Sequence, residues 1–190
     1  SLPALTDLAL PALSRPDDVR AASRLWKADG LGVGFVPTMG ALHDGHLALI
    51  EQALDAADRV IASIFVNPAQ FAAHEDLDSY PRSLEADAEK LARAGCDLLY
   101  APTASDMYPE GFSTRILPGD PARGLESAAR PHFFGGVATV VAKLFNQVEP
   151  DIAVFGEKDY QQLQVIRAMV RDLDLPVRIL AGETRREADG

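Results

Sequence analysis

Apolar residues recur along this chain in two alternating patterns, one with the period of a helix and one continuous over a short run. Within residues 16–27, Val19, Ala22 and Trp26 share one helical face, whereas residues 32–36 carry no polar interruption. The first pattern predicts a helix and the second a buried strand. The same alternation predicts helices over residues 16–27, 46–57, 83–91, 137–148 and 160–173, and strands over residues 32–36, 59–65, 97–101, 152–155 and 177–180.

Helices that alternate with buried strands predict an α/β fold, a doubly wound parallel sheet covered by helices on both faces. No repeat or low-complexity block divides the sequence, so we expect one domain over residues 1–190. In such sheets, ligands bind beyond the carboxyl ends of the strands. The loops after Val36, Phe65 and Phe155 are therefore the first places to look for chemistry.

Composition narrows the class of protein. The 190 residues are 47% hydrophobic, enough for a core, and 18 Lys and Arg against 28 Asp and Glu give a formal charge of −10. This acidity disfavours nucleic acid and anionic membrane surfaces as partners. The single cysteine, Cys96, excludes an internal disulfide and favours a reducing, cytoplasmic location. We expect neither a signal peptide nor a membrane span, since no apolar run reaches about 18 residues.

The first loop, residues 37–46, contains two glycines and two histidines and leads directly into a predicted helix. Gly40 and Gly45 let the backbone approach a ligand, and the helix start offers unpaired N–H groups to a phosphate. His43 and His46 lie three residues apart, so both imidazoles can face one anion and stabilise charge during phosphoryl or adenylyl transfer. The alternatives are two surface histidines, or a zinc pair that lacks a recognisable third ligand.

The other two loops also offer polar side chains. Asn67 and Gln70 carry amides that suit a small polar substrate, although an ordinary Asn-Pro turn is the alternative. Lys158 can neutralise phosphates, Asp159 can accept from a ribose hydroxyl while it caps a helix, and Gln162 can reach inward; a solvated capping loop is the alternative. Neither G-x-G-x-x-G nor G-x-x-x-x-G-K-[ST] occurs, which argues against a nicotinamide dehydrogenase and a P-loop kinase.

Two weaker features remain. Glu85 and Asp87 lie on a predicted helix and have two interpretations. One of them could join nucleotide phosphates in holding Mg²⁺, or both could form a solvated helix face. The segment 130–136 enters another predicted helix through glycines, so Arg130 or His132 faces the site, or the segment is a packing loop.

Taken together, these segments resemble the pantothenate synthetase family. The resemblance rests on residues 37–46 (Pro-Thr-Met-Gly-Ala-Leu-His-Asp-Gly-His), 65–71 (Phe-Val-Asn-Pro-Ala-Gln-Phe), 80–82 (Tyr-Pro-Arg) and 155–162 (Phe-Gly-Glu-Lys-Asp-Tyr-Gln-Gln), in the family's order. It implies a Rossmann-like fold of the His-x-Gly-His nucleotidyltransferase type. It also implies a two-step ligase in which pantoate attacks the α-phosphate of ATP, assisted by Mg²⁺, to give pantoyl adenylate and pyrophosphate, and β-alanine then displaces AMP to form pantothenate.

The resemblance further implies roles for individual residues. The catalytic set would be His43, His46 and Lys158. The ATP contacts would be Met39, Gly40, Ala41, Leu42, His43, Asp44, Gly45, His46, Gly156, Glu157, Lys158 and Asp159. The pantoate contacts would be Pro37, Thr38, Gln70 and Gln162, with Gln70 also near β-alanine. Asp87 would lie near Mg²⁺, although its neighbour is Ala86 rather than a second acid.

The chain departs from the family pattern at two places. The histidine of the Arg-Pro-x-His-Phe segment is shifted by one position, to His132. The family continues beyond the region that resembles residues 186–190 into a Ser-Ser-Arg motif that grips the ATP phosphates, and then into a small C-terminal domain. We therefore expect these residues to form the N-terminal ATP- and pantoate-binding domain, with the C-terminal domain absent and with little turnover.

Two rival functions stay open at this point. One is nucleotidyl transfer to a phosphorylated acceptor, and the other is a non-catalytic nucleotide-sensing module. Gln70 and Gln162 argue against both, because neither rival needs two amides that face a small hydroxy acid. The resemblance also implies a homodimer.

Overall fold

A computed structural model describes residues 5–68, 83–119 and 131–182, with the side chains of 131–134 left out. Within these ranges, six strands form one sheet in the order β1-β4-β3-β2-β5-β6, and every pair of neighbours is parallel. The predicted doubly wound parallel α/β fold is therefore confirmed. The chain moves outward from β2 in both directions, so the order reverses between β2 and β5. This reversal is where such sheets bind ligands.

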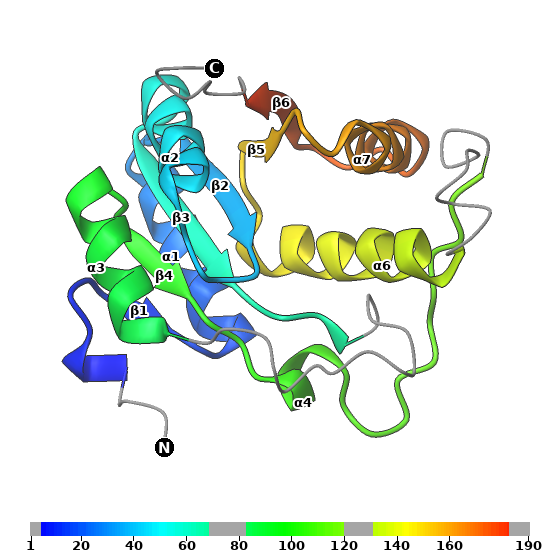
Figure 1. The fold of residues 1–190 in the computed structure, drawn as a ribbon, viewed down its shortest axis with the longest axis horizontal. Coiled ribbons are helices and arrows are strands. Elements are labelled where there is room, and N and C mark those ends of the chain that lie inside the picture. The colour runs from blue at the N-terminus through cyan, green and yellow to red at the C-terminus, as the bar shows by residue number, and fades with distance from the viewer. Residues whose placement is uncertain (1–4, 69–82, 120–130, 183–190) are drawn as a thin grey trace.

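The elements follow the predicted alternation (Figure 1). The strands are β1 (Ala12–Leu13), β2 (Val33–Thr38), β3 (Arg59–Ile64), β4 (Leu98–Tyr100), β5 (Ile152–Gly156) and β6 (Arg178–Gly182). The helices are α1 (Pro16–Ala28), α2 (Asp44–Ala56), α3 (Leu84–Ala94), α4 (Ala104–Met107), α6 (Pro131–Val148) and α7 (Tyr160–Asp172), preceded by a 3₁₀ turn (Leu5–Asp7).

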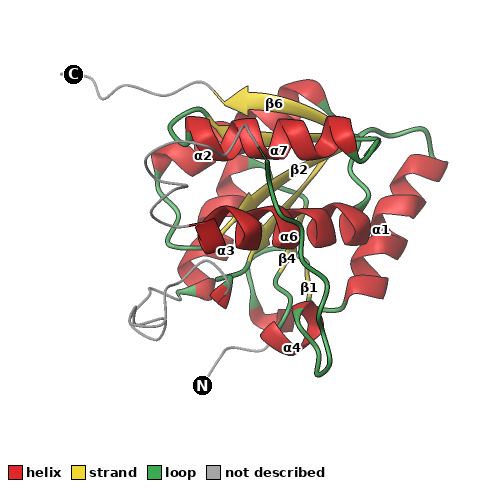
Figure 2. Cartoon of the chain, turned by 90° about the vertical axis from the view of Figure 1, so that its right-hand side faces the viewer, coloured by secondary structure: helices red, strands yellow, loops and turns green. Residues whose placement is uncertain are grey.

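The helices cover both faces of the sheet. Figure 2 shows α1, α6 and α7 on the near face, while α2 and α3 lie on the far face. Each face has its own apolar core. On the far face, Ile50 and Ala53 of α2 and Leu91 of α3 are buried against the sheet. Among the described residues, no helix is both long enough and apolar enough to cross a bilayer.

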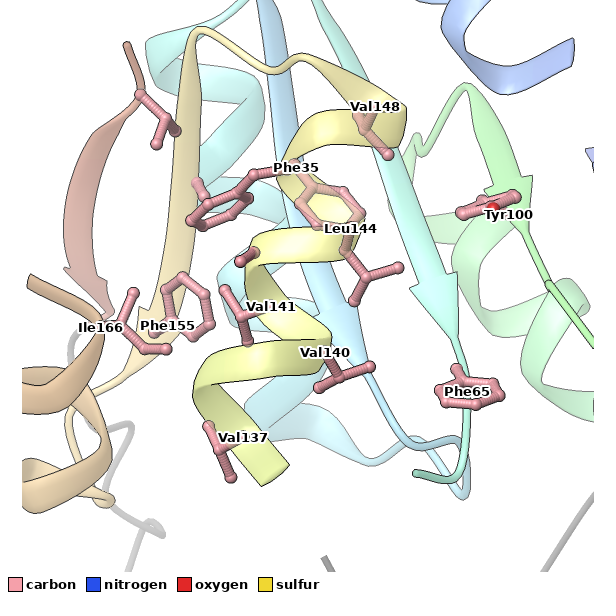
Figure 3. Close-up of a cluster of buried hydrophobic side chains, with 14 of the residues drawn as sticks. Phe35, Phe65, Tyr100, Val137, Val140, Val141, Leu144, Val148, Phe155 and Ile166 are labelled. Carbon is pink, nitrogen blue, oxygen red and sulfur yellow. The ribbon is translucent and has the colours of Figure 1, made fainter. Parts of the chain in front are cut away.

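The near-face core is built on α6. Figure 3 shows Val140, Val141 and Leu144 along this helix, which lies beside the strands that carry Phe35 and Phe155, and all five residues belong to one buried cluster. The ring of Phe145 meets both phenylalanines edge-on, with ring centres 6.3 Å from Phe35 and 6.2 Å from Phe155. Aromatic pairs favour this edge-to-face geometry. The packing fixes α6 across β2 and β5, beside the reversal of the strand order.

Some predicted boundaries are wrong. Helix α2 begins at Asp44 rather than at 46, because His43 is its N-cap. Helix α6 begins at Pro131, ahead of the predicted 137, since Gly135 and Gly136 continue the helix instead of leading into it. The 3₁₀ turn and β1 were not predicted, because they are too short to show a period. Helix α3 begins at Leu84 rather than at 83, and its N-cap residue, Ser83, makes no side-chain capping hydrogen bond.

Candidate active site

A cleft of about 390 Å³ opens at the carboxyl ends of β2, β3 and β5, as predicted for this fold class. Its polar wall comes from the loop after β2, the residues after β3, and the start of α7. Its apolar wall is the first half of the α6 face that also packs the core. The lining residues are Pro37, Thr38, Met39, Gly40, Ala41, His43, His46, Phe65, Asn67, Val137, Val140, Val141, Leu144, Phe155, Asp159 and Gln162.

The loop between β2 and α2 has an unusual backbone. Gly40 has φ +88° and Ala41 has φ +54°, so two successive residues lie in the left-handed region. An alanine there costs about 1 kcal/mol or more, which other contacts must offset. The Thr38 hydroxyl donates to Ser63 O at 2.8 Å and accepts from the Gly40 N–H at 3.2 Å, so the end of β2 is tied to β3.

Two side chains of helix α3 hold the same loop through hydrogen bonds to its backbone. The carboxylate of Asp87 accepts from the Ala41 N–H and from the Leu42 N–H, both at 2.9 Å. The Lys90 ammonium donates to Leu42 O at 2.9 Å. The side chain of Leu42 is buried in the far-face core. The N–H, the carbonyl and the side chain of Leu42 are thus all engaged by the protein, and Leu42 is not among the residues that line the cleft.

His43 and His46 form a reciprocal cap at the start of α2. Nδ1 of His43 accepts from the Gly45 N–H at 3.1 Å, and Nδ1 of His46 accepts from the His43 N–H at 3.2 Å. A neutral imidazole whose Nδ1 accepts must carry its proton on Nε2. Both rings therefore present an Nε2–H donor, and their Nδ1 atoms are committed to the backbone. The ring centres lie 4.1 Å apart.

Gly45 makes this pairing possible. A Cβ at position 45 would lie 2.9 Å from Cε1 of His43 and 3.1 Å from its Nδ1, closer than side chains normally approach. Only a residue without a side chain lets the His43 ring fold back over the first turn of α2. The glycine between the two histidines is thereby explained by packing.

The electrostatics favour an uncharged His46. Burial of the ring lowers the pKa of His46 to about 4, repulsion from His43 adds to the effect, and the carboxylate of Asp87 offsets part of it. At neutral pH the His46 ring is then a neutral hydrogen-bond donor. It can stabilise negative charge that develops on a phosphate without any proton being taken up beforehand.

Asn67 lines the cleft, and hydrogen bonds hold its side-chain amide. It is 1% exposed. Its Oδ1 accepts from the Tyr108 hydroxyl at 2.8 Å, and its Nδ2 donates to Gly136 O at 3.1 Å. Burial raises the pKa of Tyr108 to about 12, so this hydroxyl keeps the proton it donates. No sequence pattern indicated Tyr108, because it is distant in the chain and follows a short helix that no period reveals.

The third predicted loop is only partly at the cleft. Asp159 and Gln162 line it, while Gly156, Glu157 and Lys158 do not. Lys158 is exposed and makes no ion pair with any described residue. Asp159 lies at the N-cap of α7, but its side chain makes no capping hydrogen bond, contrary to the prediction.

The remaining predicted site residues either are not described or do not line the cleft. Gln70 and Arg130 fall outside the described residues, as does the side chain of His132. Asp44 and Gly45 belong to the first turn of α2 and do not line the cleft. The apolar wall from α6, Val137 to Leu144, was missed, since valine and leucine at helical spacing indicate only a core.

Metal binding by side chains alone finds little support in the described part of the chain. That part contains no group of three or more His, Cys, Asp or Glu side chains placed to hold a metal ion. The zinc interpretation loses support, because Nδ1 of both histidines faces a backbone N–H. Asp87 is 2% exposed, and both its oxygens accept from backbone amides. Its predicted place near Mg²⁺ stays a prediction.

Comparison with known sequences places the chain in a family. A sequence model described as pantoate-beta-alanine ligase matches residues 12–190. The chain belongs to this family. It is 61% identical over 181 residues to the pantothenate synthetase of Maricaulis maris, covering 95% of this chain and 63% of that protein. It is 62% identical over 173 residues to the pantothenate synthetase of Caulobacter vibrioides, covering 91% of this chain and 61% of that protein.

Solved structures agree with the sequence relatives. The crystal structure of pantothenate synthetase from Thermus thermophilus has a TM-score of 0.87 and 53% identity, over 95% of this chain and 64% of that one. Pantoate-beta-alanine ligase from Francisella tularensis, complexed with beta-gamma ATP and beta-alanine, has a TM-score of 0.88 and 39% identity, over 95% of this chain and 69% of that one. The chain thus spans about three fifths of the length of the curated relatives that it matches.

Proposed function

We propose that this protein takes part in the ATP-dependent condensation of pantoate with β-alanine to give pantothenate, by way of pantoyl adenylate. The observation that carries the proposal is the pair of imidazoles that line the cleft, each with Nδ1 accepting from a backbone N–H and its proton therefore on Nε2. Family membership supports the substrates, and the Francisella relative was crystallised with beta-gamma ATP and beta-alanine.

The first chemical step is adenylation. A carboxylate oxygen of pantoate bonds to the α-phosphorus of ATP, and the bond from that phosphorus to the bridging oxygen breaks, which releases pyrophosphate. Negative charge is redistributed over the phosphate oxygens as the bonds change. His43 and His46 donate through Nε2–H to these oxygens, and because the donors are already oriented, little reorganisation is needed during the step.

The second step forms the amide. The amine of β-alanine bonds to the acyl carbon of the adenylate, the bond from that carbon to the AMP oxygen breaks, and a proton leaves the nitrogen for solvent. Pro37, Thr38 and Gln162 at the cleft, with Gln70, are proposed to hold pantoate, and Gln70 also to lie near β-alanine. The apolar wall from α6 suits the branched carbon skeleton of pantoate and excludes water from the reacting acyl group.

The ATP contacts follow the two loops. We propose that Met39 to His46 lie along the phosphates, although Leu42 contributes only by shaping the backbone. We propose that Gly156 to Asp159 follow the nucleotide, with Lys158, which is exposed, free to turn to a phosphate and Asp159 to a ribose hydroxyl. Mg²⁺ enters as the metal ion of the substrate MgATP, where it neutralises phosphate charge, so no step requires a metal held by protein ligands alone.

Three wider expectations belong to the same proposal. The relatives are longer than the matched region, and we propose that their remaining residues close over the phosphates. These 190 residues alone would then bind substrates and turn over slowly. We propose a cytoplasmic location, supported by the lone Cys96, and a homodimeric assembly, supported by the resemblance to the family.

Isotope transfer tests the reaction. With pantoate labelled by ¹⁸O in its carboxylate, AMP should gain one ¹⁸O per turnover, and exchange of labelled pyrophosphate into ATP should require pantoate. His46→Ala should lower the exchange rate by about 10²-fold, because it removes an oriented donor. His46→Gln, which keeps an N–H donor on the side chain, should lose less.

Three results would contradict the proposal. Exchange that depends on a phosphorylated acceptor and ignores pantoate would indicate a different nucleotidyltransferase. Tight ATP binding with no effect of pantoate on its affinity, measured by calorimetry, would indicate a sensing module. An unchanged exchange rate in His46→Ala would reduce that histidine to a structural cap.

A further inference from the structure

We propose that Asp87 is a positioning residue of the candidate active site, which with Lys90 sets the backbone of the loop over residues 39–42 from the side away from the cleft. The loop's part in ATP binding rests on the proposed function. The grip on the loop itself rests on hydrogen bonds between described residues.

The contacts form a clamp on one peptide segment. The two oxygens of Asp87 accept from successive backbone N–H groups, those of Ala41 and Leu42, and Lys90 donates to the carbonyl of Leu42. Asp87 and Lys90 lie three residues apart on α3, so both face the same side of that helix. The clamp therefore fixes the segment through both its donors and its acceptor.

The loop needs such a partner. Gly40 and Ala41 both have positive φ, and the next two N–H groups, those of Ala41 and Leu42, point to the same carboxylate. Successive N–H groups arranged in this way form a concave site for an anion. In this protein the concavity holds the protein's own carboxylate. A Cβ at Gly40 would lie 3.3 Å from Oδ2 of Asp87, so the carboxylate is packed directly against the loop.

The position of the loop backbone determines where the cleft-lining residues lie. Gly40 and Ala41 line the cleft, and His43 follows Leu42 directly in the chain. A loop that loses its clamp moves the backbone N–H of His43, which is the group that holds Nδ1 of His46. Both imidazole donors therefore depend on a carboxylate that does not itself line the cleft.

This role differs from that of a metal ligand. Asp87 is 2% exposed, and each of its oxygens already accepts from a backbone N–H. The residue before it is Ala86, so no second carboxylate stands beside it. A positioning residue affects ATP binding whether or not Mg²⁺ is present, whereas a metal ligand affects it only when Mg²⁺ is present. The two roles can thus be separated by experiment.

The test compares Asp87→Asn and Lys90→Met with a control, Glu89→Gln, which changes an exposed acid on the same helix. Hydrogen exchange of the Ala41 and Leu42 amides is followed by NMR, and ATP affinity is measured by calorimetry, once with Mg²⁺ and once with EDTA. Asp87→Asn should speed exchange at both amides by at least about tenfold and weaken ATP binding by about tenfold in both conditions. Lys90→Met should show smaller effects in the same direction, and Glu89→Gln none.

Several outcomes overturn the proposal. It is wrong if exchange at Ala41 and Leu42 is unchanged in Asp87→Asn, or if ATP affinity falls only when Mg²⁺ is present, which would make Asp87 a metal ligand. If Asp87→Asn does not fold, as judged by circular dichroism, Lys90→Met decides in its place. Absence of ATP binding in the unsubstituted protein would contradict the proposed function, while the exchange measurement would still decide whether Asp87 sets the loop.

Discussion

We predict that the substitution Gly45→Ala displaces the ring of His43 while it leaves the stability of α2 almost unchanged. The new Cβ would lie 2.9 Å from Cε1 of His43, and normal contact begins near 3.4 Å, so the ring must move by about 0.5 Å or rotate away. Either movement breaks the hydrogen bond from the Gly45 N–H to Nδ1. The His43 ring, which lines the cleft, then loses the hydrogen bond that orients its Nε2–H donor.

The effects on stability nearly cancel. Loss of the N-cap bond costs about 1 kcal/mol, and replacing glycine by alanine in a helix returns up to about 1 kcal/mol. The melting temperature should therefore change by no more than about 3 °C. The proposed reaction is more sensitive, because misplacing one oriented donor costs about 10²-fold in rate. We expect a variant that folds normally and exchanges pyrophosphate about a hundred times more slowly.

The assay is pantoate-dependent pyrophosphate exchange, combined with thermal unfolding. Gly119→Ala is the matched control, since a Cβ at that position meets no heavy atom within 4 Å. His43→Ala completes a double-mutant cycle: in its background, Gly45→Ala should have no further effect on rate. The reasoning fails if Gly45→Ala keeps the unsubstituted rate, or if it slows exchange equally with and without the His43 ring.

Two further predictions concern stability. Below pH 6.5 His46 becomes protonated in the unfolded chain, whereas in the folded chain its pKa is about 4 and it stays neutral. The free energy of unfolding should therefore fall as pH drops from 6.5 to 4. We expect a fall of about 1 to 2 kcal/mol, because solvent screens this partly exposed ring. Urea unfolding across this range should show a smaller fall in His46→Gln, and parallel curves for the two proteins would contradict the explanation. Gly182→Ala would place a Cβ against the side chain of Leu49, which can rotate away, and 3.3 Å from the backbone oxygen of Phe155, which cannot. We expect it to lower stability in urea unfolding by about 1 kcal/mol. Equal stability of Gly182→Ala and Gly119→Ala would refute the predicted overlap.

The fold was predictable because burial on both faces leaves a strong signal. Strands such as β3 and β5 are largely apolar runs, and the helices between them show a clear period. The predicted helix boundaries were wrong where a specific side-chain contact, rather than the hydrophobic period, sets the end of the helix. Histidine is not a typical N-cap, so the pairing of His43 with the first turn of α2 could not be expected from residue preferences.

The candidate site was only partly predictable. The sequence places loops at strand ends, but it does not say which way a side chain points. From the helical pattern, Asp87 could lie on a solvated face or near Mg²⁺. In the structure its carboxylate is buried and accepts from the backbone N–H groups of Ala41 and Leu42, which lie 46 and 45 residues away in the chain. Tyr108 meets Asn67 across 41 residues. Contacts of this kind depend on the packing of α3 and α4, which no local pattern encodes.

The reciprocal histidine cap has a consequence for directed evolution of this protein. Asparagine and aspartate start helices at least as well as histidine, so His43→Asn should preserve α2 while it removes the ring. Selection for expression or heat resistance would accept such a variant. Under the proposed role of His43, libraries screened for folding alone would therefore accumulate chains that lack the proposed donor, and a screen for the proposed reaction is needed to keep the imidazole.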